Sequence, residues 1–178
     1  DELFAEELDK LLNAGAVGVI FDLSVNPGGY LDSVANMLSY LTPTGTKLVG
    51  FSSTKAPIYS TDGTALEPTD KVLNLPIVVI CSQHTASAGE LFTGAVKDFR
   101  EMGLMKSTVV GKTTYKKGVM QTTLSLGNGD TITITTAYYY SPLGNNNDID
   151  GVSPDVFVDS ESDYLPTAIF EMNKLLSQ

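Results

Sequence analysis

The amino-acid sequence predicts an α/β fold in which buried strands alternate with amphipathic helices. Two apolar runs, 17–23, which is nearly continuous, and 77–81, have the composition of strands that are buried on both faces. Each run is followed by a turn of small residues and then by a segment with helical spacing of apolar residues. A β-prone pair, 118–126 and 130–140, is joined by Gly127-Asn128-Gly129, which predicts a hairpin. This alternation is typical of α/β domains rather than of β-sandwiches.

The first half of the chain contains two expected helices and two expected strands. Apolar side chains recur at helical spacing in residues 2–14, directly before the first strand. A second helix is expected at 30–41, because helical spacing resumes after the turn Asn26-Pro27-Gly28-Gly29. A second strand is expected at 47–53. Residues 54–75 are rich in Thr, Pro, Asp and Gly, and we expect mainly loop there with short extended pieces.

The second half repeats the pattern and adds the hairpin. The buried strand 77–81 is followed by a helical pattern over 86–102 and by a short strand at 108–110. After the hairpin, helical periodicity returns at 165–176. No repeat or linker divides the chain, so one domain is expected.

Composition excludes several classes of function. The chain has 178 residues and a net charge of −10, with 11 Lys and Arg against 21 Asp and Glu. This acidic balance disfavours nucleic acid as a partner. One Cys and one His cannot form an internal disulfide or an ordinary zinc site, so no metal is expected. No apolar run reaches 18 residues, so neither a membrane span nor a signal peptide is expected in this segment.

The chemistry is expected at two corners where a buried strand ends in a small-residue turn and a helix begins, since backbone N–H groups are exposed there. The first corner is Asn26-Pro27-Gly28-Gly29. Paired glycines let the backbone approach a ligand and turn N–H groups toward it, as an oxyanion hole requires. An ordinary strand-to-helix turn explains the same residues.

The second corner, residues 84–90, contains Ser87 between two small neighbours at the start of a helix. Its hydroxyl is expected to be accessible, as in a nucleophile elbow, although Ser87 and Thr85 also suit helix N-capping. A serine nucleophile needs a base, and we expect the nearby His84 to point elsewhere. Lys117 is the candidate base if desolvation supplies a neutral amine, and a solvated surface lysine is the alternative. The local sequence nominates Ser87 and Lys117 without selecting them.

Five short motifs follow one another along the chain: DLSVNPGG at 22–29, TASAGE at 85–90, KKGVMQ at 116–121, TAYYYSPLG at 136–144 and GVSPD at 151–155. Read in order, they resemble the C-terminal processing peptidases, also called tail-specific proteases, of the serine peptidase class. The pattern of that family is DLRxNPGG, SASASE, GKGxxQ, TxxYYxPxG and GxxPD. Each match is weak alone, but the ordered set is specific and covers about residues 15–158.

The resemblance implies a site and a fold. Carried over position by position, it implies the following residues: Ser87 as nucleophile, Lys117 as general base, Gln121 as support for that lysine, the backbone N–H groups of Gly28 or Gly29 and of Ala88 as the oxyanion hole, and Asp98 as a supporting residue. The implied fold is the crotonase/ClpP-like α/β spiral of strands flanked by helices, with the hairpin near 118–140. No cofactor is implied.

The resemblance also implies substrate and context. Substrates would be proteins or peptides bound near their C-terminus and cleaved through an acyl-enzyme, outside the cytoplasm, with the targeting segment upstream. Family members place a PDZ domain and a leading strand before this core, so residues 1–178 are expected to be a single core domain without them. Four family positions differ, at Ser24, Thr85, Gly89 and Lys116. None removes the nucleophile, the base or the glutamine.

Two alternatives stay open. A degenerate member of the same fold would bind peptides without cleaving them, and the four departures are compatible with that. Acyl-CoA chemistry on a crotonase fold would use similar oxyanion donors but leaves Ser87, Lys117 and Gln121 unexplained. The run Tyr138-Tyr139-Tyr140 is expected to serve packing, with Tyr139 on the opposite face from its neighbours.

Overall fold

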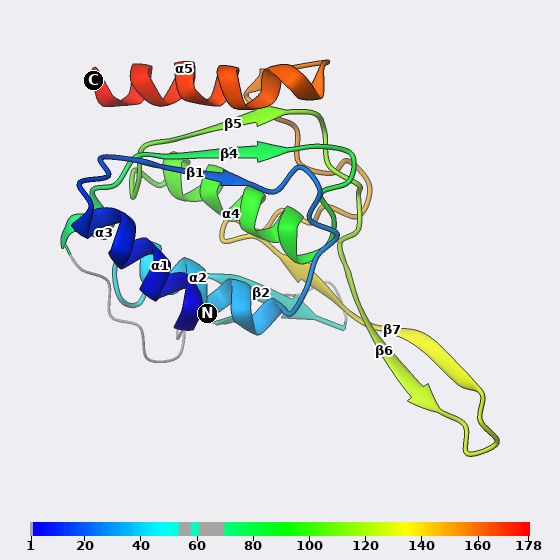
Figure 1. Ribbon diagram of the computed structural model, residues 1–178. Helices are drawn as coiled ribbons and strands as arrows, with labels where there is room; N and C mark the ends of the chain where they lie inside the picture. Colours follow the sequence, from blue (N-terminus) through cyan, green and yellow to red (C-terminus); the bar gives the residue numbers. More distant parts are fainter. Residues whose placement is uncertain (1, 54–57, 61–69) are drawn as a thin grey trace.

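Two four-stranded sheets organise the fold, which the computed structural model describes for residues 2–53, 58–60 and 70–178 (Figure 1). The parallel sheet has the order β1 (Val19–Asp22), β4 (Ile77–Cys81), β5 (Ser107–Gly111) and β8 (Val156–Phe157). The antiparallel sheet has the order β3 (Ile58–Ser60), β2 (Val49–Ser52), β7 (Thr131–Tyr140) and β6 (Val119–Ser125). The α/β prediction is confirmed, with a parallel sheet flanked by helices and a separate antiparallel sheet.

Helices lie on both faces of the parallel sheet. The helical elements are α1 (Glu2–Asn13), α2 (Leu31–Leu41), α3 (Asp70–Leu73), α4 (Ala88–Glu101), the 3-10 turn η1 (Glu161–Asp163) and α5 (Tyr164–Leu176). Helix α5 covers one face of the sheet, and α4 packs on the other, between the two sheets (Figure 1). No helix within the described residues has both the length and the apolar composition needed to cross a membrane.

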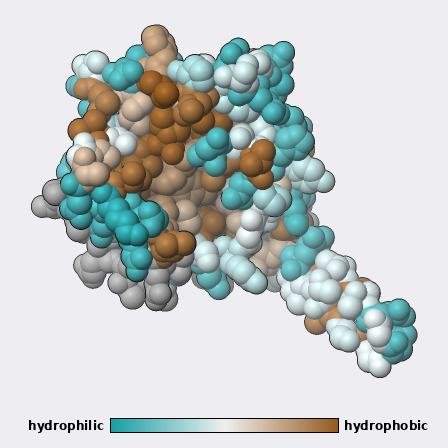
Figure 2. Space-filling view, viewed as in Figure 1, coloured by the Kyte–Doolittle hydropathy of each residue, from teal (hydrophilic) through white to brown (hydrophobic). Residues whose placement is uncertain are grey.

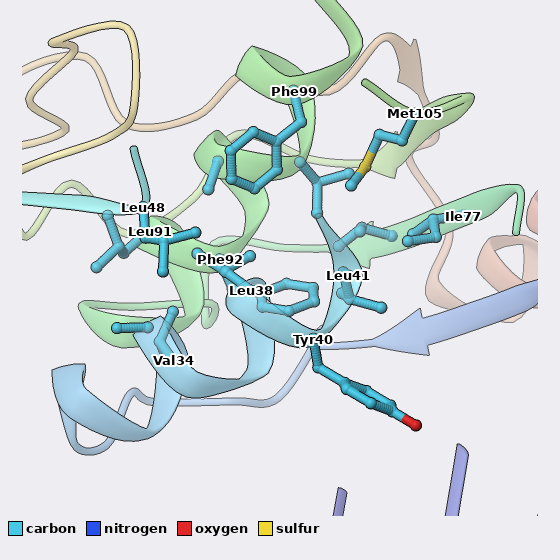
Figure 3. Close-up of a cluster of buried hydrophobic side chains, with 14 of the residues drawn as sticks. Val34, Leu38, Tyr40, Leu41, Leu48, Ile77, Leu91, Phe92, Phe99 and Met105 are labelled. Carbon is cyan, nitrogen blue, oxygen red and sulfur yellow. The ribbon is translucent and has the colours of Figure 1, made fainter. Parts of the chain in front are cut away.

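Strand β4 divides the hydrophobic core in two. Its alternating side chains send Ile77, Val79 and Cys81 into the core around α4, and Val78 and Ile80 into the smaller core under α5. All five are at most 1% exposed. Figure 3 shows the larger core, to which α2 contributes Leu38 and Leu41 and α4 contributes Leu91, Phe92 and Phe99. This packing holds the N-terminus of α4 at the end of β4.

The expected elements agree with the structure except at β1 and at three short elements that the sequence did not predict. Strand β1 is shorter than the predicted 17–23, and its burial on both faces is incomplete: Phe21 packs against the larger core and Ile20 against the smaller one, but both are only partly buried. The strand lies at the edge of the sheet, and Val19 is its one buried residue. The short elements α3, β8 and η1 were not anticipated, because two to four residues carry no clear periodicity. Of the expected loop 54–75, residues 54–57 and 61–69 lie outside the described part of the chain.

The hairpin of β6 and β7 is partly detached from the body. The last residues of β7 pair with β2, but the outer halves of β6 and β7 pair only with each other and project away from the sheets (Figures 1 and 2). A register shift between Met120 and Gln121 marks the base of this projection. Its outer part, 121–135, is hereafter the arm. Figure 2 also shows apolar residues gathered around the edge strand β1 and helix α1.

Candidate active site

The two corners singled out in the sequence lie side by side. Strands β1 and β4 are parallel neighbours with Asp22 opposite Ile80, so the turns that follow them leave the same edge of the sheet. The Ala86 N–H donates to the Asn26 carbonyl oxygen at 3.0 Å. The Thr85 hydroxyl donates to the Leu23 carbonyl oxygen at 2.7 Å. Thr85 therefore joins the corners and does not cap the helix.

Ser87 begins helix α4 in an unusual backbone conformation. It occupies the N-cap position with φ 54° and ψ −116°. A positive φ at a residue with a Cβ costs conformational energy and is retained where the surroundings impose it, frequently at functional sites. The same kind of sharp turn from strand to helix exposes the serine of a nucleophile elbow. Ser87 is half-buried at the end of such a turn.

The glycine corner approaches Ser87 closely. A Cβ atom on Gly28 would lie 2.8 Å from the Ser87 Cβ and 3.4 Å from the Ala88 nitrogen, and Gly28 has φ 114°. Glycine is therefore required at this position. The Gly28 N–H already donates to the Asn26 Oδ1 at 2.9 Å. Within the described residues the Gly29 N–H has no such acceptor, and the Ala88 N–H is among the first of α4, which have no acceptor inside the helix.

One pocket brings the predicted catalytic residues together. It has a volume of about 280 Å³, and its lining comprises Gly29, Tyr30, Leu31, Asp32, Ser87, Lys117, Val119, Met120 and Gln121. Ser87, Lys117 and Gln121 thus share one cavity although they come from different elements. A second, mainly apolar pocket of about 170 Å³ also contains Gly29 and Tyr30 in its lining, so the two pockets adjoin.

A buried glutamate links the segments that carry Ser87 and Lys117. The Glu90 side chain is fully buried. Its Oε2 accepts the N–H of Ser87 at 2.9 Å and the N–H of Lys117 at 2.8 Å. Its Oε1 accepts the N–H of Lys116 at 2.7 Å and the hydroxyl of Thr114 at 2.6 Å. Sequence reasoning missed this role, although an acid three residues after an N-cap serine is a capping-box signal.

A buried tyrosine links the same two segments through their carbonyl groups. The Tyr139 hydroxyl lies 3.0 Å from the Ser87 carbonyl oxygen and also hydrogen-bonds to the Lys117 carbonyl oxygen. Burial raises the pKa of Tyr139 far above its ordinary value, and the charges of Glu90 and Asp148 act in the same direction. The hydroxyl therefore stays protonated and remains a donor. Packing, the role expected for the run Tyr138-Tyr139-Tyr140, therefore explains Tyr139 only in part.

Two further residues named from the sequence lie apart from this pocket. Asp98, only 4% exposed, accepts the Leu143 N–H at 2.9 Å and the Asn145 Nδ2 at 3.3 Å. Burial raises the pKa of Asp98, against the effect of these hydrogen bonds. It supports the loop after β7 and lines a different pocket. His84 is exposed, with its Nε2 3.2 Å from the Gln83 amide nitrogen.

The remaining titratable groups do not form a metal centre. Within the described ranges, no three His, Cys, Asp or Glu side chains are arranged to hold a metal ion. The single cysteine, Cys81, is buried in β4, and burial raises the pKa of its thiol to about 12. Besides Ser87, Lys117 and Gln121, the polar side chains that line the pocket are those of Tyr30 and Asp32.

Comparison with known proteins identifies similar sequences and folds. The model of peptidase family S41 matches residues 1–158. A chloroplastic C-terminal processing peptidase of Tetradesmus obliquus is 33% identical over 159 residues, covering 89% of this chain and 32% of that protein. A carboxy-terminal-processing protease of Bartonella bacilliformis is 30% identical over 142 residues, covering 80% and 31%. The chain thus spans about a third of the length of these relatives.

The structural comparison agrees with the sequence comparison. The solved structure of a photosystem II D1 C-terminal processing protease superposes with a TM-score of 0.66 at 32% identity. The superposition covers 85% of this chain and 37% of that one.

Proposed function

The chain belongs to peptidase family S41, and from that membership we propose that residues 1–178 act as the catalytic core of a serine endopeptidase that cleaves polypeptides near their C-terminus. The pocket that Ser87, Lys117 and Gln121 line together carries the proposal. The preference for the C-terminal region rests on the names of the similar processing proteases, and a location outside the cytoplasm rests on family resemblance.

The proposed reaction uses a Ser–Lys dyad. The neutral amine of Lys117 takes the proton of the Ser87 hydroxyl, and the Ser87 Oγ attacks the carbonyl carbon of the peptide bond. Collapse of the tetrahedral intermediate breaks the C–N bond, and Lys117 returns the proton to the leaving amine. Water then attacks the acyl-enzyme, with Lys117 again as base, and releases the acid and free Ser87. Gln121, in the same pocket, is proposed to orient the lysine amine.

The oxyanion of the tetrahedral intermediate needs two N–H donors. Of the residues named from the sequence, Gly28 has its N–H engaged by the Asn26 side chain. The N–H groups of Gly29 and Ala88 are therefore the proposed pair. Ala88 adds the positive end of the α4 dipole, which favours developing negative charge.

The apolar pocket beside the oxyanion corner supports a preference for an apolar side chain next to the cleaved bond. Leu23, Met37 and Phe92 contribute to its wall, as do Gly29 and Ala88, the proposed oxyanion donors. A substrate carbonyl held by those two N–H groups would place its own side chain toward this pocket. Peptides with an apolar residue on the acyl side of the cleaved bond are thus the proposed substrates.

The dyad is tested by comparing Ser87→Ala and Lys117→Ala with the wild type, using a fluorophosphonate probe and an apolar fluorogenic peptide. Loss of a member of such a catalytic unit costs about 10⁴-fold or more in turnover, so both variants should lose labelling and hydrolysis. Lys106→Ala, which removes an exposed cation elsewhere in the chain, should retain both. Full activity of Lys117→Ala would overturn the dyad. A folded wild type that is never labelled would favour the non-catalytic peptide-binding alternative.

A further inference from the structure

Two fully buried side chains, Glu90 and Tyr139, contact the backbone of both proposed dyad residues. We propose that the Glu90 carboxylate and the Tyr139 hydroxyl form a brace that sets the position of Ser87 relative to Lys117. Neither side chain lines the active-site pocket, so both would act as positioning residues. The inference rests on the proposed dyad and deepens it.

The brace acts through shared atoms. The N–H groups of Ser87 and Lys117 donate to the same oxygen, Oε2 of Glu90, at 2.9 and 2.8 Å. The separation of these two nitrogens is therefore limited by two short hydrogen bonds, although the residues are 30 positions apart in the sequence. The carbonyl oxygens of the same two residues share the single proton of the Tyr139 hydroxyl. The N–H and the C=O of each dyad residue thus both contact the brace.

The chemistry of the brace explains why it is rigid. A buried carboxylate is costly unless its oxygens accept hydrogen bonds, and Glu90 accepts four of them from two loops. Hydrogen bonds to an ionised acceptor are stronger than neutral ones. Glu90 also lies in the first turn of α4, where the helix dipole favours a negative charge. If either loop moved, an oxygen of the buried Glu90 carboxylate would lose its hydrogen-bond donor.

The brace also accounts for the backbone conformation of Ser87. A serine with φ 54° requires surroundings that impose the conformation. The bond from its own N–H to Glu90 and the contact of its carbonyl oxygen with Tyr139 hold the peptide groups on both sides of this angle. The nucleophile and the base therefore depend on the same two side chains for their placement.

The test compares two brace variants with two matched controls. Tyr139→Phe removes only the shared hydroxyl, and Glu90→Gln replaces one acceptor oxygen by an amide donor. Tyr40→Phe removes another buried tyrosine hydroxyl, which donates to Asp9 at 2.7 Å. Glu171→Gln alters another buried carboxylate, which is bound by Lys174 on α5. For each protein, kcat and KM for the fluorogenic peptide, the rate of fluorophosphonate labelling and Tm are measured.

The brace variants should lose on the order of tenfold to a hundredfold in kcat and in labelling rate, because displacements of about 1 Å in a catalytic group have effects of that size. KM should stay within about twofold, since the pocket lining is unchanged. The control variants should keep the wild-type kcat even where their Tm falls as far as that of the brace variants. Equal losses of kcat in controls and brace variants at equal Tm would mean general destabilisation and would overturn the brace.

The single variants together distinguish a failure of the brace from a failure of the dyad. If Ser87→Ala and Lys117→Ala abolish activity but Tyr139→Phe retains full kcat, the brace is wrong and the dyad stands. If Ser87→Ala and Lys117→Ala retain activity, the dyad itself is wrong. Should Glu90→Gln fail to fold, Tyr139→Phe decides, because it deletes a single oxygen atom.

Discussion

Lys116, the residue before the proposed base, has a backbone φ of 79°. This left-handed conformation is disfavoured for residues that carry a Cβ, and the resembled family has glycine at this position. The conformation turns the Lys116 N–H toward Glu90, to which it donates at 2.7 Å. The strain at Lys116 is therefore balanced by the hydrogen bonds that hold the adjacent Lys117.

A pair of substitutions tests this strain. Lys116→Gly should be more stable than Lys116→Ala by about 1 kcal/mol, because only glycine adopts the left-handed region without steric cost. Both variants remove the same charged side chain, so their difference isolates the backbone effect. Urea unfolding at neutral pH measures it. An alanine variant as stable as the glycine variant would show that the residue is not strained.

At the level of elements, the arm is a two-stranded projection from the body of the fold. Beyond Gln121, β6 and β7 pair only with each other, and a two-stranded hairpin is marginal by itself. Leu124, Ile132 and Ile134 on the arm are all at least 40% exposed. The base of the arm is tied to the body, because Tyr138 to Tyr140 also pair with β2. Gln121 lies at the junction, where it lines the active-site pocket.

The arm should open independently of the body. Hydrogen exchange followed by mass spectrometry should show the amides of 122–125 and 131–135 exchanging at least about 100-fold faster than those of β4, which is fully buried. Residues 138–140 of the same strand β7 provide the internal control, since β2 pairs with them, and should be protected. Uniform protection along β7 would contradict a separately opening arm.

At the scale of the whole molecule, the side chain of Asp155 connects α4, β5 and the start of β8. Its carboxylate accepts two hydrogen bonds from the Arg100 guanidinium on α4, at 2.6 and 3.0 Å, and one from the Val109 N–H on β5, at 2.8 Å. Lys97, also on α4, lies 3.2 Å from the same carboxylate, and Asp155 itself directly precedes β8. Burial alone would raise the pKa of Asp155, but these hydrogen bonds and charges hold it below its ordinary value. Within the GVSPD segment, Asp155 therefore connects elements of the fold and does not line the active-site pocket.

This network predicts how stability depends on pH. Because the folded-state pKa of Asp155 is lowered, its contribution is fully present above the ordinary aspartate pKa of about 3.9 and is lost as pH falls through the folded value. Asp155→Asn should therefore lower the free energy of unfolding by about 2 kcal/mol at pH 7. The difference from the wild type should shrink progressively below about pH 4.

Denaturant unfolding from pH 3 to 8 measures the effect of Asp155→Asn. The control is Asp159→Asn, because Asp159 also pairs with a lysine, Lys112, but its side chain is 86% exposed. That variant should be close to the wild type throughout, since exposed ion pairs are screened by solvent. A constant difference between Asp155→Asn and the wild type across this range would show that ionisation of Asp155 is not the cause.

The longer elements and the ordered motifs could be predicted from the sequence. The run 77–81 agrees with β4 residue for residue, and the expected hairpin and the helices at 30–41 and 165–176 agree within one residue. Such elements are predictable because burial imposes a local period on side chains. The motifs identified Ser87 and Lys117 as candidate catalytic residues because each motif is a short, local sequence signal.

Which side chains and backbone groups come into contact could not be predicted from the sequence, because these contacts join distant segments. The edge position of β1 and the contacts of Glu90 and Tyr139 with both Ser87 and Lys117 depend on the path of the chain through space. Hydrogen bonds between residues 22 to 52 positions apart leave no periodic trace in a single sequence. The sequence therefore names the proposed catalytic groups, and the tertiary contacts set their positions.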